Sequence, residues 1–357
     1  MKIKIISLIS FLTLALFSCK EKGLRPVEIV NQMKPDTLIS VNDVEFEKLL
    51  IYRNIDKDSI VNGKIKIIDS TKIRTIDFFE ANGFNIQDFS NFAIFPNLKV
   101  LKLGGKPKFI DLSKCKNLTF VEIYAPNIDF RGVDLTQNNK LTGVRISTIS
   151  QLLYKLDLSK NSKLANVFLS IQNESPSSDF SLILHDDAKL LGLYIDLMGY
   201  SLNNFDTIIQ KVDTNAENIG IFGIINEIDD LNFAKMNKLK LLYLDGLKLK
   251  KVVLPDESSV IKYVDLTRLS LGKVDLSSYS NLYRVNINFM PNIKNLDISS
   301  STKINIFASL QCPKLDKICV NNLQKIDSFP SYPANAHGPD NQHLWFRDPW
   351  AKWVVCK

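Results

Sequence analysis

The sequence predicts a β-rich solenoid of about ten coils, each of roughly 22 residues, held together by parallel strand ladders. Three observations support this fold class. A short apolar phrase recurs along 98–321, it recurs at a fixed interval, and its apolar residues alternate as they do in a strand. The chain has 357 residues, of which 45% are hydrophobic, so it can bury a large core.

Two interleaved series of short phrases build the repeat. The first, fourth and sixth places of each phrase are apolar and are expected to point inward, whereas the second and fifth places point outward. The first series reads LKVLKL (98–103), LTFVEI (118–123), LTGVRI (141–146), LANVFL (164–169), LLGLYI (190–195), IGIFGI (219–224), LKLLYL (239–244), IKYVDL (261–266) and LYRVNI (282–287). The second series often has Asp in its fifth place and includes FRGVDL (130–135), LYKLDL (153–158), LGKVDL (271–276) and IKNLDI (293–298). A strand of this length cannot bury its apolar face alone, so successive coils must stack.

The aspartates of the second series are expected to form a column on one face of the stack. Asp134 and Asp157 are each followed two places later by a hydroxyl residue, Thr136 and Ser159, which can serve as a hydrogen-bond partner. We therefore interpret the column as a solvated structural face. Calcium binding is the alternative, but Val253 interrupts the column and no ligand loop surrounds it, so we predict no metal and no cofactor.

The repeat resembles leucine-rich repeats, and in particular the short class with alternating half-units found in Bacteroidetes surface lipoproteins and internalin-like proteins. The resemblance covers 98–321. A parallel β-helix of another kind is the structural alternative. The regularity fails near 170–218, where we expect a longer coil and a helix over 201–218, inserted on the convex side.

The N-terminus carries the features of an export signal. Lys2 and Lys4 precede an apolar run, and Leu16-Phe17-Ser18-Cys19 resembles the bacterial lipobox. The resemblance implies a signal peptide over 1–18, lipidation of Cys19, a tether over 19–40 and a lipid-anchored protein of the outer membrane in the cell envelope. An ordinary signal peptide or an uncleaved anchor is the alternative. Surface display and periplasmic display both stay open.

Both ends of a solenoid need a cap. We expect an N-terminal cap over 41–97 that begins with a helix from Val44 to about Tyr52, and a C-terminal cap over 322–357 that contains every tryptophan of the chain. By the resemblance to bacterial leucine-rich proteins, Cys319 is expected to pair with Cys356, with Cys312–Cys356 as the alternative and Cys115 left as a buried free thiol.

Motifs for catalysis are not found. The sequence has no H-E-x-x-H, no G-x-S-x-G and no nucleotide-binding glycine loop, so we predict that the protein is not an enzyme. The net charge of +7 is spread among interspersed signs, which disfavours a nucleic-acid partner.

The sequence favours a monomeric protein that binds another macromolecule, a protein or a polysaccharide, through a solenoid face. Rigid, shallow solenoid surfaces suit such partners, and Tyr and Arg are common binding anchors. A structural envelope lipoprotein without a dedicated ligand is the alternative, followed by carbohydrate capture at the tryptophan cluster of Trp345, Trp350 and Trp353. The outward residues of the first series include Lys99 and Lys102. The candidate binding residues on the same face are Glu122, Arg145, Phe168, Tyr194, Tyr243, Tyr263, Tyr283 and Arg284.

Overall fold

The computed structural model describes residues 37–67, 72–77, 86–88, 90–172, 178–198, 200–224, 227–255, 260–321 and 344–356. The predicted signal peptide, Cys19 and most of the predicted tether lie outside the described residues, as does 322–343 of the predicted C-terminal cap.

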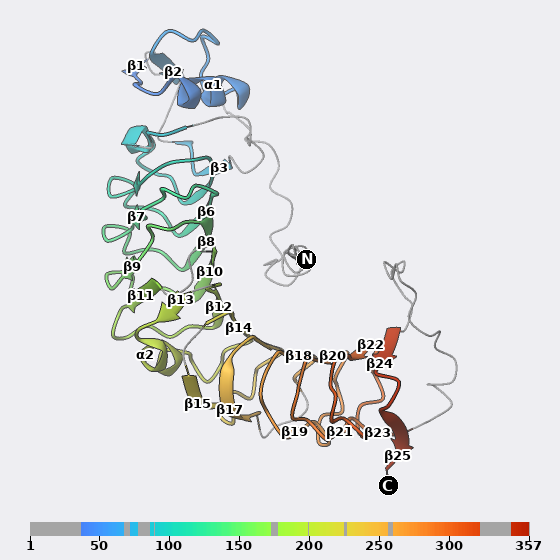
Figure 1. The fold of residues 1–357 in the computed structure, drawn as a ribbon. Helices are drawn as coiled ribbons and strands as arrows, with labels where there is room; N and C mark the ends of the chain where they lie inside the picture. The colour runs from blue at the N-terminus through green and yellow to red at the C-terminus, as the bar shows by residue number, and fades with distance from the viewer. Residues whose placement is uncertain are drawn as a thin grey trace. The chain divides into compact units, whose positions relative to one another are not determined.

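One parallel sheet of 12 strands, called here the long sheet, runs through the solenoid (Figure 1). Each strand comes from a successive coil, and neighbours in the sheet are about one coil apart in sequence. In order, the strands are β3 (Thr75–Asp77), β4 (Val100–Gly104), β6 (Phe120–Ala125), β8 (Gly143–Ile149), β10 (Asn166–Gln172), β12 (Gly192–Asp196), β14 (Asn218–Phe222), β16 (Leu241–Asp245), β18 (Tyr263–Thr267), β20 (Arg284–Asn288), β22 (Ile306–Ser309) and β24 (Leu344–Arg347).

The inward residues of the long sheet stack in register. Val144, Val167 and Leu193 occupy the fourth place of successive coils and pair across β8, β10 and β12, and each is 2% exposed or less. Burying one such side chain contributes about 1.5–3 kcal/mol, so every coil covers the apolar edge of the next. The predicted β-solenoid of about ten parallel coils is therefore confirmed.

The second series forms shorter parallel ladders on the other side of each coil. Its strands are grouped as β5–β7, β9–β11–β13, β15–β17 and β19–β21–β23–β25. Their bounds are β5 (Ile110–Asp111), β7 (Val133–Asp134), β9 (Lys155–Leu158), β11 (Ser178–Leu184), β13 (Tyr200–Leu202), β15 (Glu227–Asn232), β17 (Lys248–Val253), β19 (Val274–Asp275), β21 (Asn295–Asp297), β23 (Lys317–Val320) and β25 (Lys352–Val355).

The aspartates of the second series close local turns. Asp134 accepts hydrogen bonds from the backbone N–H and the hydroxyl of Thr136, at 2.9 and 2.7 Å, and Asp275 does the same with Ser277. Thr136 is the hydroxyl partner that the sequence indicated for Asp134. Asp134 and Asp157 are not ladder neighbours, however, because β7 pairs with β5 and β9 pairs with β11.

The register of the coil that contains β14 differs from the one that we predicted from the sequence. We placed Ile219 in the first, inward place of IGIFGI, which put Phe222 in the inward fourth place. In the structure Ile219 pairs with Leu193 and Gly220 with Tyr194, so Ala216 takes the first place and Phe222 points outward. Ala216 is fully buried there, a small residue in a place that other coils fill with leucine or isoleucine.

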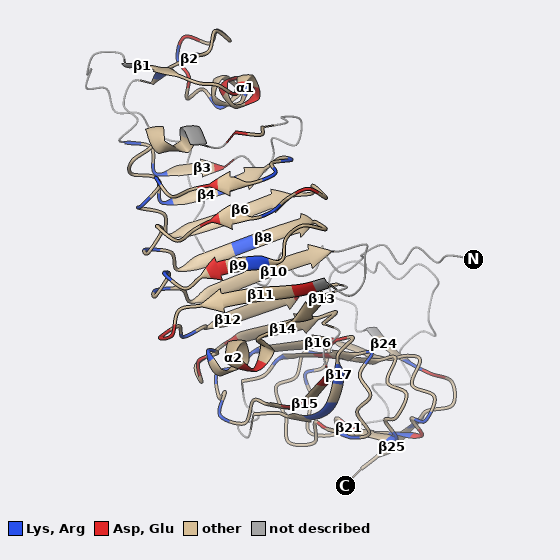
Figure 2. Cartoon of the chain, turned by 60° about the vertical axis from the view of Figure 1, so that its left-hand side comes forward, with Lys and Arg blue, Asp and Glu red and all other residues tan. Residues whose placement is uncertain are grey.

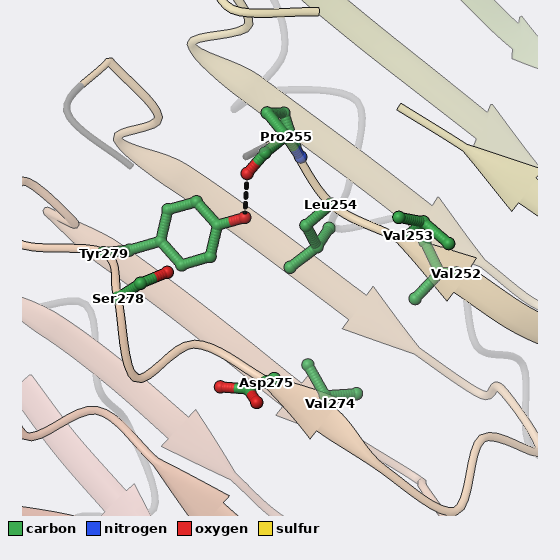
Figure 3. A pocket seen from close by; sticks show the side chains of 8 residues that line it. All are labelled: Val252, Val253, Leu254, Pro255, Val274, Asp275, Ser278 and Tyr279. Atoms are coloured by element: carbon green, nitrogen blue, oxygen red, sulfur yellow. Dashed lines mark hydrogen bonds between the residues drawn. The ribbon is translucent and has the colours of Figure 1, made fainter. Parts of the chain in front are cut away.

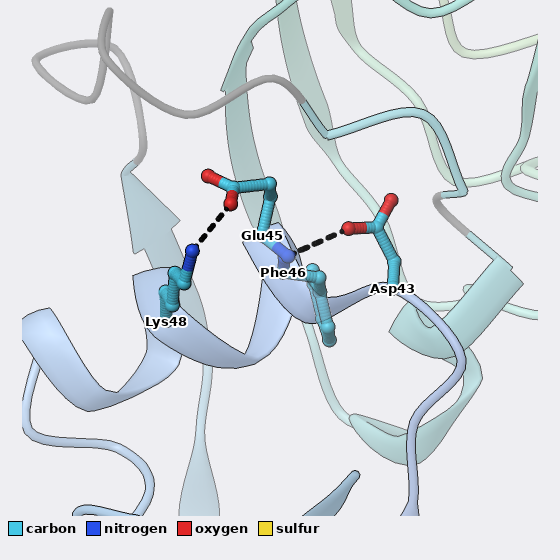
Figure 4. A network of polar contacts seen from close by, with 4 residues as sticks. All are labelled: Asp43, Glu45, Phe46 and Lys48. Carbon is cyan, nitrogen blue, oxygen red and sulfur yellow. Dashed lines mark hydrogen bonds and ion pairs between the residues drawn. The ribbon is translucent and has the colours of Figure 1, made fainter. Parts of the chain in front are cut away.

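The N-terminal part begins earlier than expected. Thr37–Ser40, which we assigned to the tether, forms β1 and pairs antiparallel with β2 (Lys64–Ile67). Helix α1 (Val44–Tyr52) has the predicted bounds and is capped by Asp43, whose carboxylate accepts from the N–H groups of Glu45 and Phe46 at 2.9 and 3.1 Å (Figure 4). The second Asp43 oxygen accepts from the N–H groups of Gln87 and Asp88, which ties the helix to a distant segment.

The insertion contains less helix than predicted. Helix α2 spans only Phe205–Gln210, because β13 occupies its expected beginning and Val212 bridges to Leu190 beyond it. Tyr200 of β13 is fully buried, and its hydroxyl donates to the Ser150 carbonyl at 2.7 Å. In the described part of the chain, no helix has the length and hydrophobicity required to cross a membrane.

At the C-terminal end, Cys319 and Cys356 form a disulfide with a Cα–Cα distance of 5.3 Å, which confirms the predicted pairing. Cys115 and Cys312 are buried free thiols. Trp345 and Trp353 pack on Phe307 with ring centroids 5.5 Å away in each case, so both rings contribute to closing the core. Trp350 is 49% exposed, and its indole N–H donates to the Cys312 carbonyl at 3.0 Å.

Candidate ligand-binding face

The outward face of the long sheet carries most of the candidate binding residues. Its central row, called here the fifth-place column, contains one residue from each strand from β3 to β20. Register pairs set the order of this column as Asp77, Lys102, Glu122, Arg145, Phe168, Tyr194, Gly220, Tyr243, Asp265 and Asn286. Successive members lie on strands about 4.8 Å apart, so their side chains are direct neighbours.

The first half of the column neutralises its own charges. Lys102 lies 3.3 Å from Asp77 and 3.9 Å from Glu122, and Arg145 lies 3.4 Å from Glu122. Figure 2 shows acidic and basic positions, coloured red and blue, on strands of this part of the sheet. The Arg145 guanidinium also lies over the Phe168 ring, 4.1 Å from its centroid, which is a close cation–π contact.

Four aromatic rings continue the column as one stripe, called here the aromatic stripe: Phe168, Tyr194, Phe222 and Tyr243. Phe168 and Tyr194 are stacked with centroids 4.1 Å apart and planes 4° from parallel. Tyr194 and Phe222 are 4.7 Å apart, and Phe222 and Tyr243 are 4.2 Å apart. Phe222 comes from the neighbouring row and fills the space above Gly220, where a Cβ would lie 2.8 Å from Tyr194 and 2.9 Å from Phe222.

Contacts within the aromatic stripe cover most of its ring surface. Tyr194 is only 5% exposed and Phe222 only 4%, whereas Phe168 and Tyr243 are half-buried. We expected Tyr194 to be an exposed contact residue, and this expectation is wrong because the rings of Phe168 and Phe222 cover it. The surface that a partner could contact therefore consists mainly of the half-buried rings of Phe168 and Tyr243, rather than a row of exposed ring faces.

Three carboxylates border the aromatic stripe on its C-terminal side: Asp196, Asp245 and Asp265. Asp245 is 1% exposed and is held by a two-pronged contact with Arg268, at 2.7 and 2.8 Å. Asp196 accepts a hydrogen bond from the Ser170 hydroxyl at 3.3 Å. Asp265 accepts from the Thr267 hydroxyl at 2.8 Å and the Asn286 amide at 2.7 Å. Neither Asp196 nor Asp265 forms a salt bridge with another residue that the structure describes.

Burial perturbs the titration of this group. Loss of solvent raises the pKa of Asp196 to about 6 against the opposing hydrogen bond from Ser170, and the charge of Asp245 adds to the increase. Burial likewise raises the pKa of Asp265 to about 6, although Asn286 and Thr267 donate to it. The pKa of Tyr243 is raised by burial and by the nearby Asp265 and Asp245.

The remaining candidate residues lie one row away. Tyr263 and Arg284 pair with each other in the third-place row, and the rings of Tyr263 and Tyr283 are edge to face at 6.0 Å. Tyr283 is 42% exposed, and its hydroxyl accepts from the Asn305 amide at 2.9 Å. Sequence reasoning did not select Phe222, Asp196, Asp245, Asp265 or Arg268 as site residues. Asp265 stands in the outward fifth place of IKYVDL and could have been read from the repeat, whereas Asp196, Asp245 and Arg268 lie beyond the six-place phrases and the register predicted for Phe222 was wrong.

The opposite side of the solenoid has a shallow cavity of about 330 Å³ where β17 and β19 are not paired (Figure 3). Its lining is mostly apolar, and the Tyr279 hydroxyl donates to the Pro255 carbonyl at 2.5 Å across it. Asp275 is the one charged side chain of this lining, and it is engaged with Ser277. The lining therefore offers no pair of nucleophile and base.

No protein-family model matches this chain, and no curated protein matches it in sequence. Among the residues that the structure describes, no group of three potential metal ligands is close enough to hold an ion.

Proposed function

We propose that the protein is a lipid-anchored leucine-rich-repeat protein of a bacterial cell envelope, and that the outward face of its long sheet binds another macromolecule. The repeat phrase and its alternating half-units support the leucine-rich-repeat assignment. The charge order and the Leu16–Cys19 segment support export and lipidation at Cys19, with the outer membrane as the location. The helix α1 and the disulfide-bonded C-terminal strands are proposed as the caps of the array.

The observation that carries the proposal is the continuous fifth-place column. From Asp77 to Tyr243, charged and aromatic side chains of successive strands form one row, in which Phe222 of the neighbouring row fills the space at Gly220. Successive ion-paired atoms or ring centroids lie 3.3 to 4.7 Å apart. A prearranged row of this kind loses little side-chain entropy when a partner binds. Asp and aromatic residues so densely placed are unusual for a face that is only solvated, because burying the carboxylates costs stability.

Two other functions receive less support. Carbohydrate capture at the tryptophan cluster needs open ring faces, but Trp345 and Trp353 pack on Phe307 and on each other, with centroids 5.6 Å apart. A structural lipoprotein without a ligand would not need the aromatic stripe and its desolvated carboxylates.

Site-specific crosslinking in the producing bacterium tests the proposal. A photoreactive amino acid placed at Phe168 or Tyr243, both half-buried on the face, should give a crosslinked adduct. The same amino acid at Lys273, whose side chain is 81% exposed near the second ladder, is the control and should give none. Adducts from Lys273 alone, or from no position, would contradict binding through this face. A Cys19→Ser variant should lose incorporation of a labelled fatty acid, and protease treatment of intact cells decides the direction of display.

A further inference from the structure

The two halves of the outward face differ in charge balance. Strands β3 to β10 carry two acidic and two basic residues, Asp77, Lys102, Glu122 and Arg145, and these form one chain of ion pairs. Strands β12 to β20 carry three carboxylates, Asp196, Asp245 and Asp265, against the single arginine Arg284. Arg268, just after β18, is committed to Asp245. The C-terminal half of the face is therefore acidic.

Two arginines of the protein itself show how this face binds a guanidinium group. Arg145 lies over an aromatic ring with an acidic neighbour, 4.1 Å from the centroid of Phe168 and 3.4 Å from Glu122. Arg268 makes the two-pronged contact with a carboxylate that the planar guanidinium fits. Asp196 and Asp265 lie beside aromatic rings in the same surroundings, but no described cation lies within salt-bridge distance of either; Arg268 and Arg284 act on them only from farther away. They border the aromatic stripe at its C-terminal half, one in the row of Phe222 and the other in the row of Tyr243.

We propose that the part of the outward face formed by β12 to β18 docks an extended, arginine-bearing segment of a partner protein. This inference rests on the proposed function, because it names the chemistry of the partner that the same face would bind. Two guanidinium groups of the segment pair with Asp196 and Asp265, and the chain between them crosses the edges of Phe222 and Tyr243. Because the acidic half of the face and the basic segment carry opposite charges, the face favours this partner over neutral or acidic ones.

The register sets the spacing of the two arginines. Asp196 on β12 and Asp265 on β18 are three strand steps apart and two residues apart along the strand direction, which places them on the order of 16 Å from each other. An extended chain covers this distance in about five residues. Single metal ions or small cations cannot span it. A sugar is also a poor occupant, because the rings that it would stack on are covered by each other, with Tyr194 and Phe222 at 5% and 4% exposure.

A defined peptide tests the inference with the full-length protein. The probe is the fluorescein-labelled peptide Gly-Arg-Ser-Gly-Ser-Gly-Arg-Gly, and the matched control replaces both arginines by citrulline, which has nearly the same shape but no charge. Fluorescence anisotropy at pH 7.5 and low salt should show at least tenfold tighter binding of the arginine peptide. Equal affinity for the two peptides, or binding of neither, would overturn the inference.

Paired variants locate the contact. Asp196→Asn with Asp265→Asn should reduce the affinity for the arginine peptide to that of the citrulline peptide. Asp275→Asn with Asp297→Asn removes two carboxylates from the second ladder and should leave the affinity unchanged. The reverse pattern contradicts the inference. Circular dichroism melting of each variant verifies that it is folded.

The crosslinking experiment separates failure of this inference from failure of the proposed function. Adducts at Phe168 and Tyr243 without any preference for arginine would leave the binding face in place and remove only the arginine-bearing partner. An adduct of twice the protein mass would identify a second copy of the chain as the occupant, and a polysaccharide adduct would identify a sugar polymer; either would also overturn the inference.

Discussion

The carboxylates beside the aromatic stripe should lower the stability of the protein at neutral pH. We predict that Asp196→Asn combined with Asp265→Asn makes the protein more stable than the wild type at pH 7.5. The reason is desolvation: both carboxylates are half-buried beside aromatic rings, and no salt bridge with another described residue offsets the cost of their charge. Asparagine keeps the shape, and at Asp265 its amide can still exchange hydrogen bonds with Thr267 and Asn286.

The expected size follows from the pKa values. Each folded-state pKa is raised from 3.8 to about 6, so the folded protein binds the proton more tightly than the unfolded chain does. The stability that the protonated form provides is fully present below about pH 3.8 and is lost as the pH rises to about 6. Two pKa units correspond to about 3 kcal/mol per group, and solvent screening of half-buried side chains reduces this to about 1 kcal/mol each. The double variant should therefore gain about 2 kcal/mol at pH 7.5 and almost nothing at pH 4.

Urea denaturation followed by circular dichroism, at pH 4 and at pH 7.5, measures this difference. The neighbouring charges Asp245, Arg268 and Arg284 are unchanged in both proteins, so the comparison isolates the two substituted groups. Asp275→Asn is the control of opposite sign. Hydrogen bonds from Ser277 lower the pKa of Asp275, so this variant should be less stable than the wild type at pH 7.5 and approach it in acid. A double variant that is no more stable at pH 7.5, or whose gain does not depend on pH, would refute the desolvation argument.

Two further predictions concern the packing that shapes the face and the C-terminal end. Gly220→Ala should lower the free energy of unfolding by about 1–3 kcal/mol in urea denaturation, because the new methyl group would lie 2.8 Å from Tyr194 and 2.9 Å from Phe222. The control Gly272→Ala, with no atom within 4 Å of the new methyl group, should be neutral or stabilising. Equal effects of the two changes would count against the tight packing. Cys356→Ser should lower stability by about 3–4 kcal/mol through loss of the disulfide bond to Cys319. Dithiothreitol should bring the wild type to the same urea midpoint and leave the variant unchanged. A wild type whose urea midpoint does not change in dithiothreitol would contradict this assignment.

The repeat made the solenoid predictable from sequence. Inward places such as Val144 and Val167 follow a strict pattern, because each must meet the same place of the next coil. The ends of α1 were predictable for a similar local reason, since an acidic residue precedes the helix and its side chain can accept from the first free N–H groups. Pairing of Cys319 with Cys356 came only from the resemblance to other proteins, because composition and spacing alone also allowed Cys312.

The register of the 216–222 coil could not be predicted from pattern alone. Ile219 fits an inward place in either register, and a rule that requires a large residue in the first place rejects Ala216. Packing decides between them. Without a side chain at Gly220, the Phe222 ring can lie between Tyr194 and Tyr243, and these ring contacts favour the observed register. A pattern of single residues does not contain this information, since it depends on contacts between three coils.

The same packing favours the C-terminal half of the face as the proposed binding surface. In the first half each charge has a partner on the next strand, so a ligand would have to break the contacts of Lys102, Glu122 or Arg145 before forming its own. In the second half, the rings have already removed solvent from Asp196 and Asp265 at the expense of folding stability. A cationic group that reaches these carboxylates meets an acceptor whose desolvation has largely been completed, so most of the attraction appears as binding free energy. The predicted loss of stability at neutral pH and the proposed affinity for a basic partner thus have one physical origin.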